Sequence, residues 1–342
     1  MRPTWLLYGA NGTTGRLVLS IWQKAFPQLP PPLLAGRDAF QLTTLSQTYG
    51  CPYQAFSLAE LPTIAFSELP HLVVNLAGPY ENTTLPWVTW CEQHGIAYLD
   101  ICGEWRTFQR LYARHSSVPL ITAAGFDTVA GEAALYLLRQ RYPQARSLQL
   151  YIYAQGGFSA GTVQSALTML PHGYYQWQAG QLHPIPFQEV RLTLQGRELL
   201  FFSATLAELV TFPAWNPDIK HLATWVALPP RYVRWRSLLE RVFAWQPFAE
   251  RLLGLVRQRR ATLAHRMHLS AESFVLAAAA ETPEALLLRT PQAYVFTAWT
   301  VLRSVELFLA EGAAPGPASA FSRWRERLWG SLPGTWTRWQ PI

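Results

Sequence analysis

Seven residues near the start of the chain, Gly9-Ala-Asn-Gly-Thr-Thr-Gly15, restrict its fold more than any other feature. They follow an apolar run at 4–8 that is typical of a buried strand, and they open a segment, Thr14 to about Phe26, with apolar residues at helical spacing. Glycines at this spacing allow a tight turn, a close approach of the backbone to a pyrophosphate, and close packing of helix on strand. A phosphate there meets free N–H groups and the positive end of the helix dipole. The pattern predicts a dinucleotide-binding turn formed by Gly9, Asn11, Gly12, Thr13, Thr14 and Gly15. A structural turn in a Rossmann-like fold that has lost its cofactor is the alternative.

Strand and helix signals alternate through the first 125 residues. Apolar runs typical of buried strands lie at 32–36, 71–78, 97–101 and 118–125. Such alternation predicts βαβ units and a parallel sheet, and the lack of polar alternation indicates strands covered on both faces. We therefore expect residues 1–130 to form an α/β, Rossmann-type NADP-binding domain with a doubly wound parallel sheet.

The pattern changes after this domain. Strand patterns that favour antiparallel pairing lie at 147–154, 189–206, 221–228, 273–281 and 284–290. We expect residues 131–290 to form a second, α+β domain with a mostly antiparallel sheet, which serves substrate binding or dimerisation. Residues 291–342 are predicted to be a C-terminal helix and tail that return to the Rossmann domain.

Two residues at the end of the second strand bear on the choice of cofactor. An acidic residue at this position selects NAD by accepting from the ribose hydroxyls, whereas an arginine accommodates the 2′-phosphate of NADP. Arg37 comes directly after the strand and can hold a phosphate through two hydrogen bonds, while Asp38 is placed to cap the next helix. The sequence therefore favours NADP (NADPH) over NAD.

The segment Asn75-Leu-Ala-Gly-Pro-Tyr80 ends another strand at the sheet edge where doubly wound folds bind their ligands. Gly78 would let a ribose or nicotinamide approach the backbone, and Tyr80 is a candidate to face the substrate. A strand-terminating turn with a packed tyrosine is the alternative. The cofactor candidates in this segment are Asn75, Ala77, Gly78, Pro79 and Tyr80.

Later strands end at the same edge with further ionisable side chains, Tyr98, Asp100, Glu104 and Asp127. We take Tyr80 and Asp127 as the candidate catalytic groups, with Tyr98 as a further candidate proton donor. The alternative for Glu104 and Asp127 is a place in the first turn of the following helix, where an acid stabilises the helix dipole.

These motifs together resemble the saccharopine dehydrogenase-like oxidoreductases, most closely the bacterial trans-acting enoyl reductase branch. The resemblance lies in GANGTTG (9–15), AGRD (35–38), NLAGPY (75–80), YLDICGE (98–104) and GFDTVAGE (125–132), with further likeness at 159–167, 290–298 and 315–324. It implies a Rossmann domain with an NADP-type cofactor, an inserted α+β domain, and a C-terminal helix that rejoins the first domain.

For activity, the resemblance implies an NAD(P)H-dependent oxidoreductase that reduces an enoyl C=C or a carbonyl group. Its substrate would be hydrophobic, similar to a lipid or polyketide, and either a small molecule or carrier-linked. A non-catalytic nucleotide-binding protein at a lipid surface or in a complex is one alternative, and a saccharopine-type amino acid dehydrogenase is another. The acid-poor sequence at 147–230 argues against the last, because a zwitterionic substrate needs charged partners.

The net charge of +7 is concentrated in residues 231–260, which hold eight arginines and two glutamates. A basic amphipathic segment with tryptophans can lie on an anionic membrane, cover a sheet, or dock an acidic carrier domain. It is thus a candidate for peripheral membrane contact. Nucleic acid is not an expected partner, because no recognition motif accompanies the charge.

Neither a run of about 18 uncharged apolar residues nor a signal peptide is evident, which favours a cytoplasmic location, with membrane association through 231–260 as an option. A homodimer is a candidate assembly. No metal site is expected, since His265, His268 and Glu272 have helical metal-ligand spacing but lack a further ligand cluster.

Overall fold

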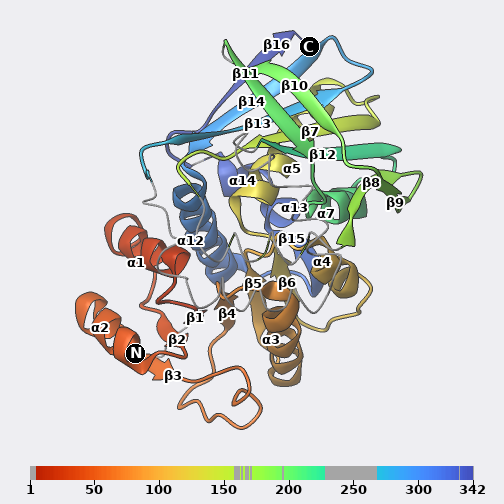
Figure 1. The fold of residues 1–342 in the computed structure, drawn as a ribbon. Coiled ribbons are helices and arrows are strands. Elements are labelled where there is room, and N and C mark those ends of the chain that lie inside the picture. Colours follow the sequence, from red (N-terminus) through yellow and green to blue (C-terminus); the bar gives the residue numbers. More distant parts are fainter. Residues whose placement is uncertain are drawn as a thin grey trace, which may run out of the picture. The chain divides into compact units, whose positions relative to one another are not determined.

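The chain forms two units in the computed structural model (Figure 1). The structure describes residues 5–157, 162, 165, 169, 172–194, 196–227, 268–330 and 332–341. Unit 1 comprises Met1–Val129 and Tyr294–Pro333, and unit 2 comprises Ala130–Ala293 and Gly334–Ile342. The basic segment 231–260 lies outside the described residues, as does most of 159–167.

Unit 1 is built on seven parallel strands in the order β15-β6-β5-β4-β1-β2-β3. The strands are β1 (Trp5–Tyr8), β2 (Leu33–Gly36), β3 (Tyr53–Ala55), β4 (Leu72–Asn75), β5 (Ala97–Asp100), β6 (Pro119–Thr122) and β15 (Gly316–Ser319). Every residue of β1, β2, β4 and β5 is buried, because helices and loops cover both faces. The predicted doubly wound Rossmann sheet is confirmed, and its strand order reverses between β1 and β4.

Helices follow most strands of this sheet. They are α1 (Thr13–Ala25), α2 (Ala39–Tyr49), α3 (Tyr80–His94), α4 (Trp105–Tyr112) and α5 (Phe126–Arg141), the last of which continues into unit 2. The C-terminal part of unit 1 adds α12 (Ala293–Glu311), α13 (Ala320–Trp324) and α14 (Glu326–Trp329).

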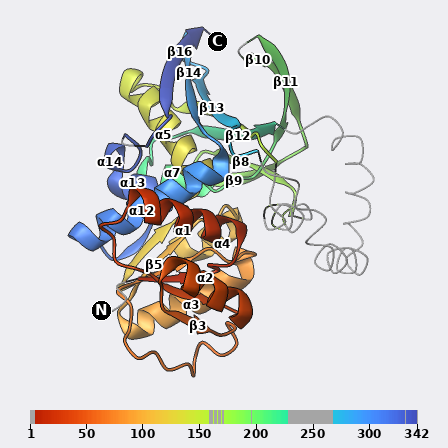
Figure 2. The same ribbon diagram turned by 90° about the vertical axis from the view of Figure 1, so that its left-hand side faces the viewer.

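Helix α12 is a core element of unit 1. Phe296 is 1% exposed and packs edge-on against Phe126, with ring centroids 5.7 Å apart. The Thr300 hydroxyl donates to the Ala124 carbonyl at 2.6 Å, and at the far end of α1 the rings of Phe26 and Trp299 lie 5.1 Å apart. Figure 2 shows α12 beside α1. Among the described helices α12 alone has the length and apolar composition to cross a bilayer, and half of that stretch is buried. Packing in unit 1 accounts for its apolar composition.

Unit 2 contains a nine-stranded, mostly antiparallel sheet. Seven strands follow the order β10-β11-β12-β7-β13-β14-β16, and β8 and β9 pair beside β12. The strands are β7 (Ser147–Tyr153), β8 (Tyr174–Gln178), β9 (Gln181–Ile185), β10 (Glu189–Leu194), β11 (Arg197–Ser203), β12 (His221–Ala227), β13 (Glu272–Ala279), β14 (Glu284–Pro291) and β16 (Trp336–Pro341). Only β7 and β12 run parallel, and helix α7 (Glu208–Trp215) follows β11. The predicted α+β class is confirmed.

The end of the chain corrects one expectation. The tail within 291–342 was expected to join the Rossmann domain as a whole, but β16 pairs antiparallel with β14 in unit 2. The Arg141 guanidinium lies 4.5 Å from the centre of the Trp339 ring and forms an ion pair with Glu284 at 2.6 Å. Strand pairing and this cation–π contact hold the last strand in unit 2.

Alanine substitution of two phenylalanines of unit 1 tests whether α12 is a core helix. Phe296→Ala is expected to lower the free energy of unfolding by about 3–5 kcal/mol, because the lost ring leaves a cavity in the core. Phe40→Ala removes a ring that is 82% exposed and should change stability by less than about 0.5 kcal/mol. Urea titration followed by tryptophan fluorescence measures both, and equal effects would contradict a core position for Phe296.

Candidate functional site

The glycine-rich turn after β1 requires glycine at two positions. Gly9 has φ +82°, in the left-handed region, and a Cβ there would lie 3.1 Å from the Ala77 nitrogen. A Cβ on Gly15 would lie 2.5 Å from the Gly9 carbonyl oxygen. The start of α1 therefore packs directly on the turn, and the turn packs on the backbone that follows β4. This packing brings Gly9 and Ala77, two of the predicted cofactor residues, together at the point where the strand order reverses.

The N-terminus of α1 is open. Gly12 is the extended N-cap residue, no described side chain caps the helix, and its first turn holds no acidic residue. The Gly12 N–H bonds the Gly9 carbonyl at 3.0 Å, and the first bond into the helix runs from the Arg16 N–H to the Gly12 carbonyl. The N–H groups of Thr13, Thr14 and Gly15 precede that bond, so they are free for an anion. A dinucleotide's pyrophosphate fits this cradle in charge and in backbone clearance.

The N-terminus of α3, unlike that of α1, is capped by a carboxylate. The Glu104 carboxylate, 5% exposed, accepts from the backbone N–H of Tyr80 at 3.0 Å and of Glu81 at 2.6 Å. Glu104 thus sits at the start of α4 and caps a helix 24 residues earlier in the chain. An anion already occupies the dipole of α3, which leaves α1 as the better of these two sites for a phosphate.

A buried amide shapes the backbone after β4. Asn75 is fully buried, and its Oδ1 accepts from the Ala77 N–H at 3.0 Å. Its Nδ2 donates to the hydroxyls of Tyr98 at 3.0 Å and Thr83 at 3.1 Å. Asn75 therefore holds the turn in front of Gly9, and both N–H donors of its buried side chain are used within the protein. The Gly78–Pro79 peptide bond that follows is cis.

Asp100 joins three elements beneath the same edge. Its Oδ1 accepts from the N–H of Cys102 at 3.1 Å and of Ala123 at 3.0 Å, and its Oδ2 accepts from the Tyr98 hydroxyl at 2.9 Å. Burial raises the pKa of Asp100 to about 6, against these hydrogen bonds, which lower it. Asp100 is fully buried and positions the loops after β5 and β6. Tyr98 is also fully buried, and desolvation raises its pKa well above the ordinary value.

The two candidate catalytic groups differ in access. Tyr80 is 7% exposed, and burial raises the pKa of its phenol well above the ordinary value, so it stays protonated at neutral pH. Asp127 lies in the first turn of α5 and is exposed, with Oδ2 3.8 Å from where a Cβ on Gly103 would stand. Desolvation by surrounding atoms nevertheless raises the pKa of Asp127 to about 6. Neither the Tyr80 hydroxyl nor the Asp127 carboxylate has a hydrogen-bond partner within the described part of the chain. Asp127 combines solvent access with a pKa suited to proton transfer.

Arg37 and Asp38, the two residues after β2 that are predicted to bear on the choice of cofactor, have different surroundings. Asp38 caps α2, as predicted, and accepts from the Gln41 N–H at 3.0 Å and from Gln41 Nε2 at 2.7 Å. Arg37 is exposed, and the described residues offer it no ion pair. Asn11 Oδ1 lies 3.3 Å from where a Cβ on Gly36 would stand, which places the glycine turn beside this strand end.

Sequence reasoning did not identify three residues near this strand end, Arg16, Gln41 and Phe40. Arg16 donates from Nε to the Asn11 carbonyl at 3.1 Å and from Nη2 to Gln41 Oε1 at 3.0 Å. Phe40 is 82% exposed, off the buried Leu42 and Leu45 stripe of α2. The capping-box spacing from Asp38 to Gln41 was the available signal for the link between α2 and Arg16.

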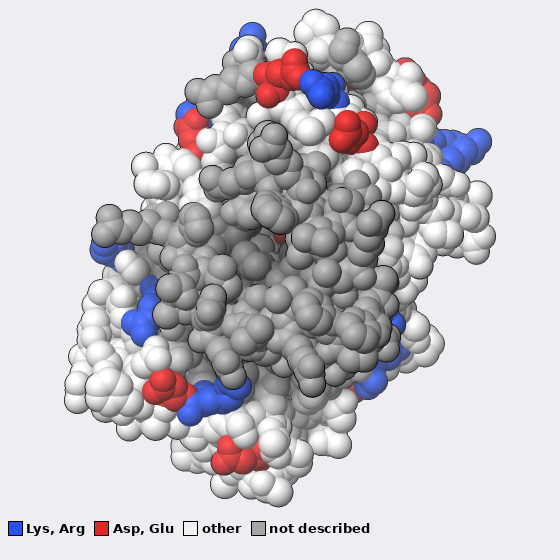
Figure 3. Space-filling model, viewed as in Figure 1, with Lys and Arg blue, Asp and Glu red and all other residues white. Residues whose placement is uncertain are grey.

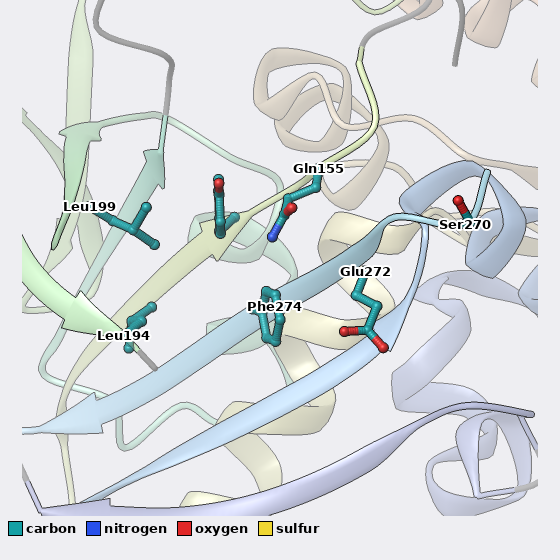
Figure 4. Close-up of a pocket in the computed structure, with 7 residues that line it drawn as sticks. Gln155, Leu194, Leu199, Ser270, Glu272 and Phe274 are labelled. Carbon is teal, nitrogen blue, oxygen red and sulfur yellow. The ribbon is translucent and has the colours of Figure 1, made fainter. Parts of the chain in front are cut away.

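Unit 2 has a hollow of its own. A cavity of about 360 Å³ is lined by Tyr153, Gln155, Leu194, Leu199, Ser270, Glu272 and Phe274 (Figure 4). The rings of Tyr153 and Phe274 stack with centroids 6.3 Å apart, and Glu272 is ion-paired with Arg289. The lining therefore combines aromatic and aliphatic side chains with three polar ones, Gln155, Ser270 and the ion-paired Glu272.

Figure 3 shows the charged side chains on one face of the molecule. On the face in Figure 3, lysines and arginines lie in small groups, several of them beside acidic residues. The segment 231–260, which was the candidate for membrane contact, lies outside the described residues.

A parallel sheet that reverses its order beside an open, glycine-rich helix start defines the class of Rossmann dinucleotide-binding folds. Comparison with known proteins gives the chain distant relatives in the families that its motifs resemble. It is 29% identical over 183 residues to a Mycobacterium tuberculosis protein assigned provisionally as a trans-acting enoyl reductase, covering 48% of this chain and 43% of that one. It is 29% identical over 151 residues to an Arabidopsis thaliana protein assigned provisionally as a mitochondrial saccharopine dehydrogenase-like oxidoreductase, covering 38% and 33%.

The chain thus spans less than half the length of these curated relatives. No protein-family model matches it. An oxidoreductase from Thermotoga maritima of known structure aligns over 92% of this chain and 90% of its own, with 12% identity and a TM-score of 0.46. At that level of similarity the alignment adds nothing to the argument from topology.

The raised pKa of Asp100 predicts a pH-dependent stability. Between pH 4 and 6 the folded protein holds a proton on Asp100 that the unfolded chain releases, so stability should fall as pH rises through this window and level off above it. The shift limits the loss to about 3 kcal/mol. Asp100→Asn should flatten this slope in urea titrations at pH 4, 5, 6 and 7. Asp127→Asn should flatten it by a similar amount, because the pKa of that carboxyl is also raised to about 6, and an unchanged slope in Asp100→Asn would contradict the assignment.

Proposed function

We propose that the protein is an NADPH-dependent reductase of an enoyl C=C or carbonyl group in a hydrophobic substrate. The observation that carries the proposal is the open N-terminus of α1 on its glycine turn, with an exposed arginine, Arg37, at the end of the neighbouring strand. The provisional assignments of the distant relatives as an enoyl reductase and a saccharopine dehydrogenase-like oxidoreductase support the class of reaction.

The preference for NADPH is argued from the two residues after β2. Asp38 directs both carboxylate oxygens to Gln41 in the first turn of α2, so its hydrogen-bonding capacity faces the helix. Arg37 has no competing anion among the described residues. A guanidinium in this position can hold a 2′-phosphate through two hydrogen bonds, which NADH does not offer.

A bound NADPH would supply the hydride for one carbon of the C=C or C=O bond and become NADP⁺, so the protein must deliver a proton to the other atom of that bond. Asp127 is our choice for the proton donor, because it is exposed, unpartnered among the described residues, and has a pKa of about 6. Tyr80, with its buried phenol, is the second choice.

A hydrophobic substrate is supported by the aromatic character of unit 2. The core on one side of its sheet includes Tyr151 stacked on Trp225 at 5.9 Å and the Tyr153–Phe274 pair beside the cavity. The cavity lining adds Leu194 and Leu199, together with the polar Gln155 and Ser270 and the ion-paired Glu272. The aromatic and aliphatic side chains suit the apolar part of an acyl chain, and the described lining offers a zwitterionic amino acid no unpaired charge.

Dinucleotide titration tests the cofactor assignment. The wild-type protein should bind NADPH more tightly than NADH, as followed by nicotinamide fluorescence. Arg37→Ala should weaken NADPH by about 10- to 100-fold, the range for one charge-assisted contact, and leave NADH nearly unchanged. Gly12→Val should abolish binding of both, because its side chain blocks the phosphate approach while its φ of −72° suits a non-glycine residue. Equal losses for both cofactors in Arg37→Ala would show that Arg37 does not read the 2′-phosphate.

Turnover tests the reaction. Loss of NADPH absorbance is measured with medium-chain enoyl and ketoacyl thioesters as acceptors. Asp127→Asn should lower kcat/KM by about 10²–10⁴-fold, the usual contribution of a general acid. In the wild type kcat/KM should decline above pH 6, as Asp127 loses its proton, and the variant should lack this inflection. A comparable loss in Tyr80→Phe, with Asp127→Asn active, would assign the proton to Tyr80. Binding of NADPH without turnover of any acceptor would favour the non-catalytic alternative.

A further inference from the structure

A chain of polar contacts links the glycine turn to the residue that would otherwise select NAD. Gln41 donates to both oxygens of Asp38, from N at 3.0 Å and from Nε2 at 2.7 Å. Its Oε1 accepts from Arg16, which donates in turn to the Asn11 carbonyl at 3.1 Å. We propose that Gln41 is a specificity-determining positioning residue, which turns Asp38 away from the cofactor's ribose so that Arg37 selects NADPH. This inference rests on the proposed function.

Because Asp38 is negatively charged, a preference for NADPH requires that its carboxylate be kept away from the ribose. A carboxylate at the end of the second strand accepts from ribose hydroxyls, which strengthens binding of NADH, and it repels a 2′-phosphate. Asp38 is adjacent to Arg37 and only partly buried, so a free rotamer would bring its charge to the same ribose. The capping position alone fixes only one of its oxygens, through the Gln41 N–H. The second oxygen depends on the Gln41 side chain.

The side-chain contacts that join Arg16, Gln41 and Asp38, which we call the clamp, fix the Gln41 amide at both its oxygen and its nitrogen. Arg16 lies in the first turn of α1, and its two contacts join the glycine turn to α2 across the end of β2. In a capping box the third helical side chain reaches back to the backbone N–H of the cap residue. Here the Gln41 amide reaches the carboxylate instead, and its oxygen is taken by Arg16. The arrangement therefore fixes the amide's orientation, with its N–H₂ toward Asp38.

The clamp contributes little to stability, which makes it testable. Its side-chain bonds are exposed or partly buried, and exposed hydrogen bonds of this kind have a small net effect on folding. Gln41→Ala also keeps the backbone N–H that caps through Asp38. The variant should fold, and a purely structural role for Gln41 would move stability without moving the choice of cofactor.

The experiment compares dissociation constants for NADPH and NADH in four proteins by titration of nicotinamide fluorescence. They are the wild type, Gln41→Ala, the double variant Asp38→Asn/Gln41→Ala, and the control Gln28→Ala. Gln28 is a matched glutamine that also donates to a carboxylate, Glu306 at 2.7 Å, beyond the other end of α1. Asn is a good N-cap residue, so Asp38→Asn removes the charge and keeps the cap.

Gln41→Ala is expected to shift the ratio of the two constants toward NADH by about tenfold, because the freed carboxylate gains a ribose hydroxyl and repels the phosphate. The double variant should return the ratio toward that of the wild type, and Gln28→Ala should leave it unchanged. A wild-type preference for NADPH that persists in Gln41→Ala would overturn the clamp and leave the proposed function intact. A wild type that binds NADH as well as NADPH would overturn the proposed cofactor and the clamp with it.

Discussion

The contact between the start of α1 and the turn after β1 is the constraint on which the candidate site depends. The Cβ position of Gly15 falls 2.5 Å from the Gly9 carbonyl oxygen, so no side chain can stand between the helix and the turn. This closeness aims the first N–H groups of α1 at the edge of the sheet where the strand order reverses. It also sets Gly9 against the Ala77 backbone, so the geometry of the turn and of the segment after β4 are fixed together.

The polar side chains under that edge hold the loops in place. Asn75, Tyr98 and Asp100 are fully buried and bonded to one another or to the backbone. A buried polar group left without a partner is costly, so each member of this network constrains the others. Burial disfavours the charged form of the Asp100 carboxyl and so raises its pKa. Its bond to the Ala123 N–H also fixes a residue with φ 56°, a backbone conformation that is unusual for alanine.

Features that depend on residues close together in the sequence could be predicted from it. The glycine turn, the buried strands β1, β4 and β5, the cap at Asp38 and the β10–β11 and β13–β14 hairpins follow from spacing and composition. Edge strands escaped prediction, because β15 contains Gly-Pro and is tolerated only where one side needs no ladder hydrogen bond. The cap of α3 by Glu104 and the pairing of β16 with β14 join distant parts of the chain, and no short window contains both partners. Asn75 is predicted from the sequence as a cofactor residue, but its hydrogen bonds to Thr83, Ala77 and Tyr98 could not be read from the sequence.

The distribution of carboxylates favours α1 over α2, α3 and α5 as the helix start that receives a phosphate. Asp38 closes α2, Glu104 closes α3, and Asp127 lies in the first turn of α5, whereas α1 begins with glycine and threonine. Negative charge at the starts of α2, α3 and α5 opposes a phosphate there, and its absence at α1 favours one. The same placement that directs the pyrophosphate to α1 leaves Arg37 without a local anion to pair with. Under the proposed function, selection of a doubly charged 2′-phosphate by that arginine would require that the nearest carboxylate, Asp38, be held toward its own helix.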